Sequence, residues 1–168
     1  MLAAGQAWGA FGPDAVPETA LLLLPAQADV SWTNALRSWQ GPRWERSFVL
    51  TPPVGQAGRL EPLLQSVLAA ARRRAPRASV QAILPFGPEL EERLPAYFAQ
   101  GFALRAVRPL AGLAPEYILA TGRLAAPQIW VELAQPTHLA LLMARGWAAV
   151  ALRRGEAGCL LGLAKMEE

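Results

Sequence analysis

The chain is poor in the residues that build disulfides, zinc sites and membrane spans. Cys159 is its single cysteine, so an internal disulfide framework is excluded, and an unpaired thiol is typical of a reducing compartment. His138 is its single histidine, which argues against a zinc site made from histidines. No apolar run approaches the roughly eighteen residues that a transmembrane helix needs. We therefore predict a cytoplasmic protein with no metal site and no membrane partner.

Charged residues are also scarce, at 17% of the 168 residues against 53% hydrophobic residues. This composition predicts a folded chain with a sizeable core and argues against disorder. Lys165 is the only lysine among 16 basic residues, and the net charge is +3. A charge of this size permits an anionic ligand but does not require nucleic acid, so we expect no nucleic-acid partner.

A strand, a turn and a long helix are expected between residues 47 and 75. Residues 47–51 (SFVLT) are a short run of strand formers, and residues 54–58 (VGQAG) form a turn with two glycines. The helix then shows the apolar spacing of one buried face, at Leu60, Leu63, Leu64, Val67, Leu68 and Ala71. Pro62 is tolerated because it lies in the first turn. Because such a helix start exposes main-chain N–H groups, it can bind an anion, phosphate above all.

Strand and helix patterns alternate through the remaining sequence. The expected strands are residues 6–11, 19–24, 79–84, 102–110, 116–120, 129–133, 149–152 and 159–163. The expected helices are a short one within the tryptophan-rich residues 29–45, one at residues 89–100 and one opened by Thr137. Residues 109–115 and 153–156 are the expected connections within the later strand pairs.

The order of these elements predicts an α/β (α+β) fold with a mixed, mostly antiparallel sheet and helices on both faces. No low-complexity linker divides residues 1–168, which we expect to form a single domain. Its parts are an N-terminal hairpin and tryptophan-rich segment (residues 1–46), a core (residues 47–122) and a C-terminal β-α-β-β unit (residues 123–168).

Two phrases in the middle of the chain carry a family resemblance. They are LTPPVGQAGRL at residues 50–60 and YFAQGF at residues 97–102. This part of the chain, roughly residues 44–120, resembles the GNAT-type acyl-CoA N-acyltransferases. In that superfamily a strand ending in V-x-P leads into R/Q-G-x-G-x-G/A at a helix start, and a Y-x-x-x-G-F phrase follows. The resemblance implies a GNAT-like sheet.

The resemblance also implies a cofactor and the residues that hold it. Acetyl-CoA would place its pyrophosphate on the amides of the turn and its pantetheine arm along the preceding strand. The implied cofactor-binding residues are Val49, Leu50, Thr51, Gly55, Gln56, Ala57, Gly58 and Arg59. Tyr97 would be the general acid that protonates the leaving thiolate. The implied acceptor is a small-molecule or peptide amine.

The sequence departs from the family pattern at several positions. Gly55 stands at the Arg/Gln position, Gln56 replaces a glycine, and Leu60 replaces the small residue nearest the phosphates. The family's first strand and helix are also missing before the hairpin. We hypothesise that residues 128–152 fill their place, in the same chain or in a partner subunit of a homodimer.

Two functions of different classes follow from these observations. The first is acyl-CoA-dependent N-acetyl transfer, and the second is a non-catalytic GNAT-like module in self-association or partner binding. For the enzyme, the candidate general bases are Glu45, Glu116 and Glu132. His138 is expected to be a cap or surface residue and Cys159 a small core residue. The arginines at residues 72–74 and 77 are expected at a solvated helix end.

Overall fold

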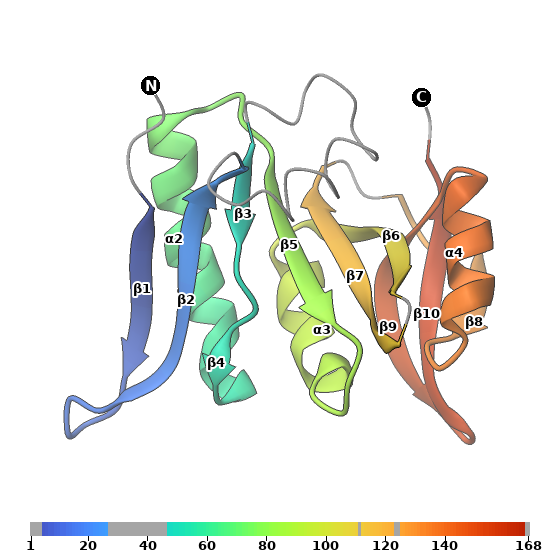
Figure 1. Cartoon of the computed structure of the whole chain (residues 1–168), viewed down its shortest axis with the longest axis horizontal. Coiled ribbons are helices and arrows are strands. Elements are labelled where there is room, and N and C mark those ends of the chain that lie inside the picture. Colours follow the sequence, from blue (N-terminus) through green and yellow to red (C-terminus); the bar gives the residue numbers. More distant parts are fainter. Residues whose placement is uncertain (1–4, 27–46, 111, 123–124, 167–168) are drawn as a thin grey trace. The chain divides into compact units, whose positions relative to one another are not determined.

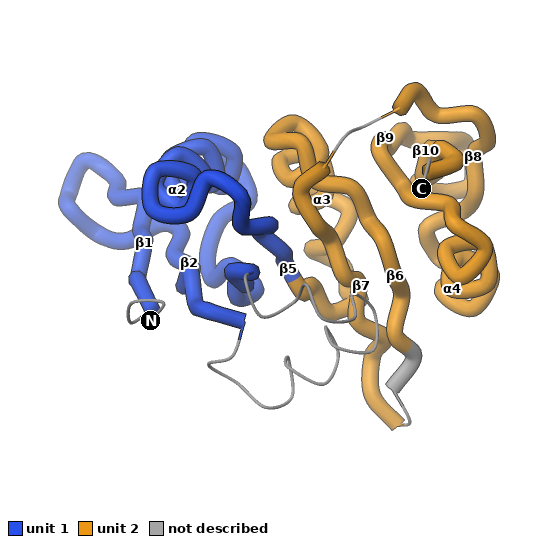
Figure 2. The backbone as a smooth tube through the Cα atoms, turned by 90° about the horizontal axis from the view of Figure 1, so that it is seen from above, with its two compact units in different colours: residues 1–82 blue, residues 83–168 orange. Residues whose placement is uncertain are grey.

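A computed structural model describes residues 5–26, 47–110, 112–122 and 125–166 of the chain. They fall into two compact units, unit 1 (Met1–Ala82) and unit 2 (Ile83–Glu168), which Figure 2 colours separately. The tryptophan-rich segment, with its expected short helix, lies outside the described residues.

Unit 1 is a mixed sheet with one long helix (Figure 1). Its elements are β1 (Gln6–Phe11), β2 (Pro17–Pro25), β3 (Phe48–Leu50), β4 (Val54–Gly55), the 3-10 helix η3 (Ala57–Arg59), α2 (Leu60–Arg74) and the start of β5 (Val80–Pro85). Strand β2 pairs antiparallel with β1, β3 and β4, whereas β3 pairs parallel with β5. The hairpin and the strand–turn–helix expected from the sequence are confirmed.

Helix α2 forms where its apolar stripe predicts. Residues of that stripe, from Leu60 through Val67 to Ala71, are almost fully buried. Each large side chain of this kind contributes about 1.5–3 kcal/mol when it leaves water. The C-terminal turn carries the exposed Arg72, Arg73 and Arg74, where cations favour the negative end of the helix dipole.

Unit 2 is an antiparallel sheet between two helices. Its elements after β5 are α3 (Leu90–Ala99), β6 (Phe102–Leu110), β7 (Leu113–Thr121), β8 (Ile129–Glu132), α4 (Pro136–Ala144), β9 (Trp147–Gly155) and β10 (Gly158–Lys165). The strand order is β7-β6-β9-β10-β8. Figure 2 shows α3 and α4 on opposite faces of this sheet. The predicted mixed, mostly antiparallel α+β architecture is confirmed.

Two connections in unit 2 are shorter than expected. The strands β6 and β7 continue into residues 109–115 and pair as far as Leu110↔Leu113, so the long connection predicted there is wrong. The turn predicted at residues 153–156 is wrong as well, because Arg153 and Arg154 pair within the sheet and Gly155 is opposite Gly158. Extended ladders satisfy more main-chain N–H and C=O groups than long loops do, which favours both extensions.

The C-terminal β-α-β-β order is present, and Ala149 of β9 pairs with Leu104 of β6. That this unit fills the place of the family's first strand and helix stays a prediction. Among the described residues, no helix is both long and apolar enough to span a membrane.

The pairing of β4 with β2 requires a glycine at position 55. Its φ is +105°, and a Cβ built there would lie 2.0 Å from the carbonyl oxygen of Glu18. Gly58, three residues later, has no heavy atom within 4 Å of such a Cβ. We expect Gly55→Ala to lower the free energy of unfolding by about 2–3 kcal/mol through strain and steric overlap.

The matched control is Gly58→Ala, which should leave the free energy of unfolding unchanged or raise it by up to about 1 kcal/mol. Urea unfolding of the two variants beside the parent chain measures both values. Equal stability of Gly55→Ala and the parent would show that the contact with Glu18 is not made in solution.

Candidate functional site

The turn before α2 is anchored to the hairpin through its main chain. The N–H of Gln56 donates to the carbonyl oxygen of Glu18 over 2.9 Å, and the Thr19 hydroxyl donates to the carbonyl oxygen of Gln56 over 2.6 Å. Gly55 sits beside this contact with no room for a side chain. The family's Arg/Gln position therefore holds a glycine because the backbone of β2 occupies the space.

Two consecutive N–H groups of this turn, those of Ala57 and Gly58, have no acceptor within the described part of the chain. The N–H of Leu60 donates to the carbonyl oxygen of Ala57, and the 3-10 pattern of η3 engages the N–H of Arg59 with Gln56 in the same way. Gly58 and Arg59 are exposed. Because the 15-residue helix α2 follows, its dipole places partial positive charge at these amides. The turn can therefore hold an anion.

Arg59 is held by an ion pair across the turn. Its Nε lies 2.7 Å from Oε2 of Glu18, and its side chain is 53% exposed. An exposed pair of this kind contributes little stability. Its effect here is to fix the guanidinium beside the turn and to place a carboxylate there as well, which opposes the binding of a second anion.

Leu60 does not stand over the turn. Its side chain is fully buried in the core of unit 1, on the apolar face of α2. The departure from the family at this position is therefore accommodated below the turn, and the space above Gly58 stays open.

The expected partners of a pantetheine arm are already engaged in the sheet. Val49 and Leu50 are fully buried in β3, between β2 and β5. The Thr51 N–H donates to the carbonyl oxygen of Leu22 over 3.0 Å, and its hydroxyl accepts from the N–H of Leu22 over 2.9 Å. The role of these three residues in holding a cofactor stays a prediction.

Tyr97 lies in unit 2, on α3, and is fully buried. Its ring meets Phe102 edge to face, with ring centroids 5.2 Å apart, and its hydroxyl finds no hydrogen-bond partner among the described residues. Burial raises the pKa of Tyr97 well above its usual value, while the nearby Arg93 lowers it by a smaller amount. The phenol is thus held protonated, as a general acid requires, but it does not reach solvent.

The candidate bases lie in different settings. Glu45 lies outside the described residues, and Glu116 is ion-paired with Arg108 across β6 and β7. Glu132 accepts a hydrogen bond of 2.6 Å from Gln135. None of these contacts assigns a base, so the roles stay predictions.

His138 and Cys159 occupy ordinary structural positions. His138 is exposed and lies 3.3 Å from the Gln135 side chain. Cys159 is buried, and its thiol donates to Glu91 over 3.2 Å. Burial and this hydrogen bond raise the pKa of the Cys159 thiol, which favours the unreactive protonated form.

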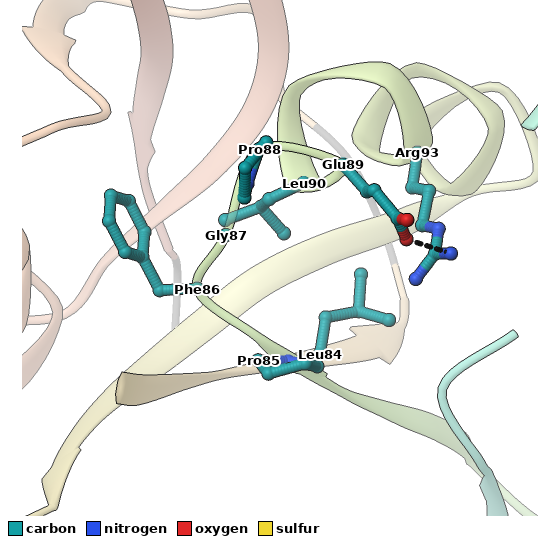
Figure 3. A pocket seen from close by; sticks show the side chains of 8 residues that line it. All are labelled: Leu84, Pro85, Phe86, Gly87, Pro88, Glu89, Leu90 and Arg93. Atoms are coloured by element: carbon teal, nitrogen blue, oxygen red, sulfur yellow. Dashed lines mark ion pairs between the residues drawn. The ribbon is translucent and has the colours of Figure 1, made fainter. Parts of the chain in front are cut away.

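The sequence reasoning missed a pocket at the start of α3, shown in Figure 3. It has a volume of about 270 Å³ and is lined by residues 84–90 and Arg93. The sequence signal for it was the pair Glu89 and Arg93, spaced four apart on an expected helix. That spacing alone does not distinguish a pocket wall from a solvated surface pair.

No protein-family model and no curated protein matches the sequence. The structure is similar to one described as "Crystal structure of a putative phosphinothricin N-acetyltransferase", with a TM-score of 0.48 and 15% identity over 70% of each chain.

Both tyrosines of the chain have raised pKa values because of burial, which brings the pKa of Tyr117 to about 12. In the unfolded chain each phenol loses its proton near pH 10. Above that pH the unfolded state binds fewer protons than the folded state, so the stability falls as pH rises. We expect a loss approaching about 1.4 kcal/mol per pH unit for each tyrosine between its unfolded and folded pKa values.

Phenolate absorbance in the near ultraviolet, followed together with circular dichroism, checks this expectation. The tyrosines should ionise only as the chain unfolds, and Tyr97→Phe should reduce the slope of stability against pH. Ionisation of both phenols near their ordinary pKa in the folded chain would contradict the burial described here.

Proposed function

We propose that the chain is an acyl-CoA-dependent N-acyltransferase that moves an acetyl group from acetyl-CoA to an amine. The observation that carries this proposal is the pair of N–H groups at Ala57 and Gly58, which have no acceptor among the described residues and lie just before α2. The GNAT-like phrases at residues 50–60 and 97–102 direct the choice of ligand to coenzyme A.

Main-chain donors do not depend on side-chain identity, so they persist although Gly55 and Gln56 depart from the family pattern. A pyrophosphate would bind to these amides and gain from the dipole of α2. The lost family side chain removes one charge-assisted contact, a cost of about 1.5–3 kcal/mol in affinity. Glu18 opposes the anion further, so we expect a modest affinity.

Acetyl-CoA supplies an activated acyl thioester when it is bound. For the transfer, the amine nitrogen forms a bond to the acyl carbon, and the bond from that carbon to sulfur breaks. Tyr97, kept protonated by burial, would give its proton to the departing thiolate. The acceptor is a small-molecule or peptide amine, and its proton passes to a base among the candidates above or to water.

A second candidate is a non-catalytic module that binds a partner or a second copy of the chain. The observation that favours it is the complete burial of Tyr97, because a general acid must touch the leaving group. The pairing of Val49 and Thr51 within the sheet favours it as well. The two candidates differ in whether coenzyme A binds and in whether turnover depends on Tyr97.

Coenzyme A binding is tested best at Gly58. Gly58→Asp places a carboxylate in the open space above the free amides, where it should repel a diphosphate. Acidic residues at a helix start stabilise by about 0.3–1 kcal/mol, so the unliganded variant should not be weakened. Gly58→Asn has nearly the same shape without the charge and is the matched control.

Thermal unfolding with and without acetyl-CoA measures the effect. At a hundred times the dissociation constant the ligand should add about 2.7 kcal/mol to the parent chain and to Gly58→Asn, and almost nothing to Gly58→Asp. The absence of any shift in the parent at millimolar ligand would end the acyltransferase proposal.

Tyr97→Phe separates the enzyme from the module. The substitution removes a buried hydroxyl without a partner and keeps the ring, so the free energy of unfolding should rise by about 1 kcal/mol. If Tyr97 is the general acid, acetyl transfer should slow by about 10²–10⁴-fold while the thermal shift with acetyl-CoA remains. An unchanged rate of thiol release would remove Tyr97 from the mechanism.

A further inference from the structure

The pocket at the start of α3 combines an apolar floor with one cationic wall. Its floor includes Leu84 of β5 and Leu90 of α3, whose side chains point toward each other in Figure 3. Its wall holds Arg93, with Glu89 beside it at the rim. A volume of about 270 Å³ suits a small ligand rather than a large cofactor.

Arg93 has more hydrogen-bond donors than partners. Its side chain is 12% exposed, yet within the described residues its guanidinium has a single acceptor, the Glu89 carboxylate. Arg93 is one of the residues that line the pocket. A guanidinium presents a planar set of five N–H donors that fits a carboxylate with two parallel hydrogen bonds.

Glu89 marks the kind of group that Arg93 binds. The carboxylate of Glu89 contacts one nitrogen of Arg93, and the Glu89 side chain is 66% exposed. A pair so exposed is weak and easily exchanged. A carboxylate from outside the chain that bound Arg93 would therefore compete with the Glu89 carboxylate.

The opposite wall is fixed in advance. Phe86 stacks on Tyr117, with ring centroids 5.9 Å apart and an interplanar angle of 22°. The Tyr117 hydroxyl in turn donates to the carbonyl oxygen of Leu133 over 3.3 Å. The loop at residues 86–88 is therefore held in place, so a ligand meets a largely formed pocket and loses less affinity to reorganisation.

We propose that this pocket binds a small carboxylate with an apolar body, its carboxylate on Arg93 and its body against the apolar residues that line the pocket. The lining of this site lies within unit 2 and includes neither Tyr97 nor the turn of unit 1. Ligand binding exchanges the Glu89 contact for a ligand contact, with no covalent step.

The test uses the full chain and sodium hexanoate as the probe, followed by amide chemical shifts in heteronuclear NMR at constant ionic strength. We expect saturable shifts centred on Gly87, Leu90 and Arg93, with a dissociation constant on the order of 1 mM. Glu89→Gln removes the competing carboxylate and should tighten binding by about two- to fivefold. Arg93→Gln should weaken it by about 10- to 100-fold.

Two controls separate this site from a general effect of charge or apolarity. Glu92→Gln changes the net charge equally, on the same helix and outside the pocket lining, and should leave hexanoate binding unchanged. Hexanol, which lacks the carboxylate, should bind at least tenfold more weakly than hexanoate. The hexanoate affinity of Arg93→Lys should fall between those of the parent and Arg93→Gln. Lysine keeps the positive charge but cannot form the two parallel hydrogen bonds of a guanidinium.

The proposal is overturned if Glu89→Gln shows no saturable shifts up to tens of millimolar hexanoate, on the order of ten times the expected dissociation constant. It is also overturned if Arg93→Gln binds as well as the parent, or if hexanol equals hexanoate, since the pocket would then be apolar only. Shifts spread over all exposed arginines would show a nonspecific ion effect and would count against the site.

Discussion

The contact between the Glu18 carbonyl oxygen and the Gln56 N–H governs the geometry of unit 1. It draws the turn onto β2 so closely that position 55 cannot carry a side chain, and it consumes one donor of the turn. The next two N–H groups, those of Ala57 and Gly58, have no acceptor among the described residues and lie just before α2. The anion site that the acyltransferase proposal requires would therefore depend on main-chain donors positioned by strand pairing, and not on the side chains that the family pattern places there.

Burial has opposite consequences for the two polar groups that stand one turn apart on α3. A phenol can enter the core by remaining neutral, so Tyr97 is buried and its pKa rises. A guanidinium keeps its charge and needs solvent or an anion at its N–H groups. Arg93 meets this need at the edge of a pocket, where the Glu89 carboxylate is its one ion-pair partner within the described residues. Helix α3 thus carries a buried, protonated tyrosine and a partly exposed arginine.

The enzyme and the non-catalytic module make different demands on the same residues. The N–H groups of Ala57 and Gly58, without acceptors among the described residues, suit either a coenzyme or any other anion, whereas acyl transfer additionally needs Tyr97 to meet the thiolate. Motion that exposes a buried tyrosine costs free energy, because its ring leaves apolar contacts with Phe102. If the chain is an enzyme, this free energy adds to the activation barrier of acyl transfer. A binding module does not need to expose Tyr97.

The sequence by itself determined the elements and their types. Apolar spacing predicted α2 from Leu60 onward, and short runs of strand formers predicted the two strands of the first hairpin, because these signals are local. Only the tertiary structure decided that Arg59 meets Glu18, 41 positions earlier, that Leu60 turns into the core, and that Tyr97 is sealed. It also decided that Arg93 lines a pocket with Leu84. Such outcomes depend on which distant segments share a surface, and residue spacing carries no information about burial or partners across that distance.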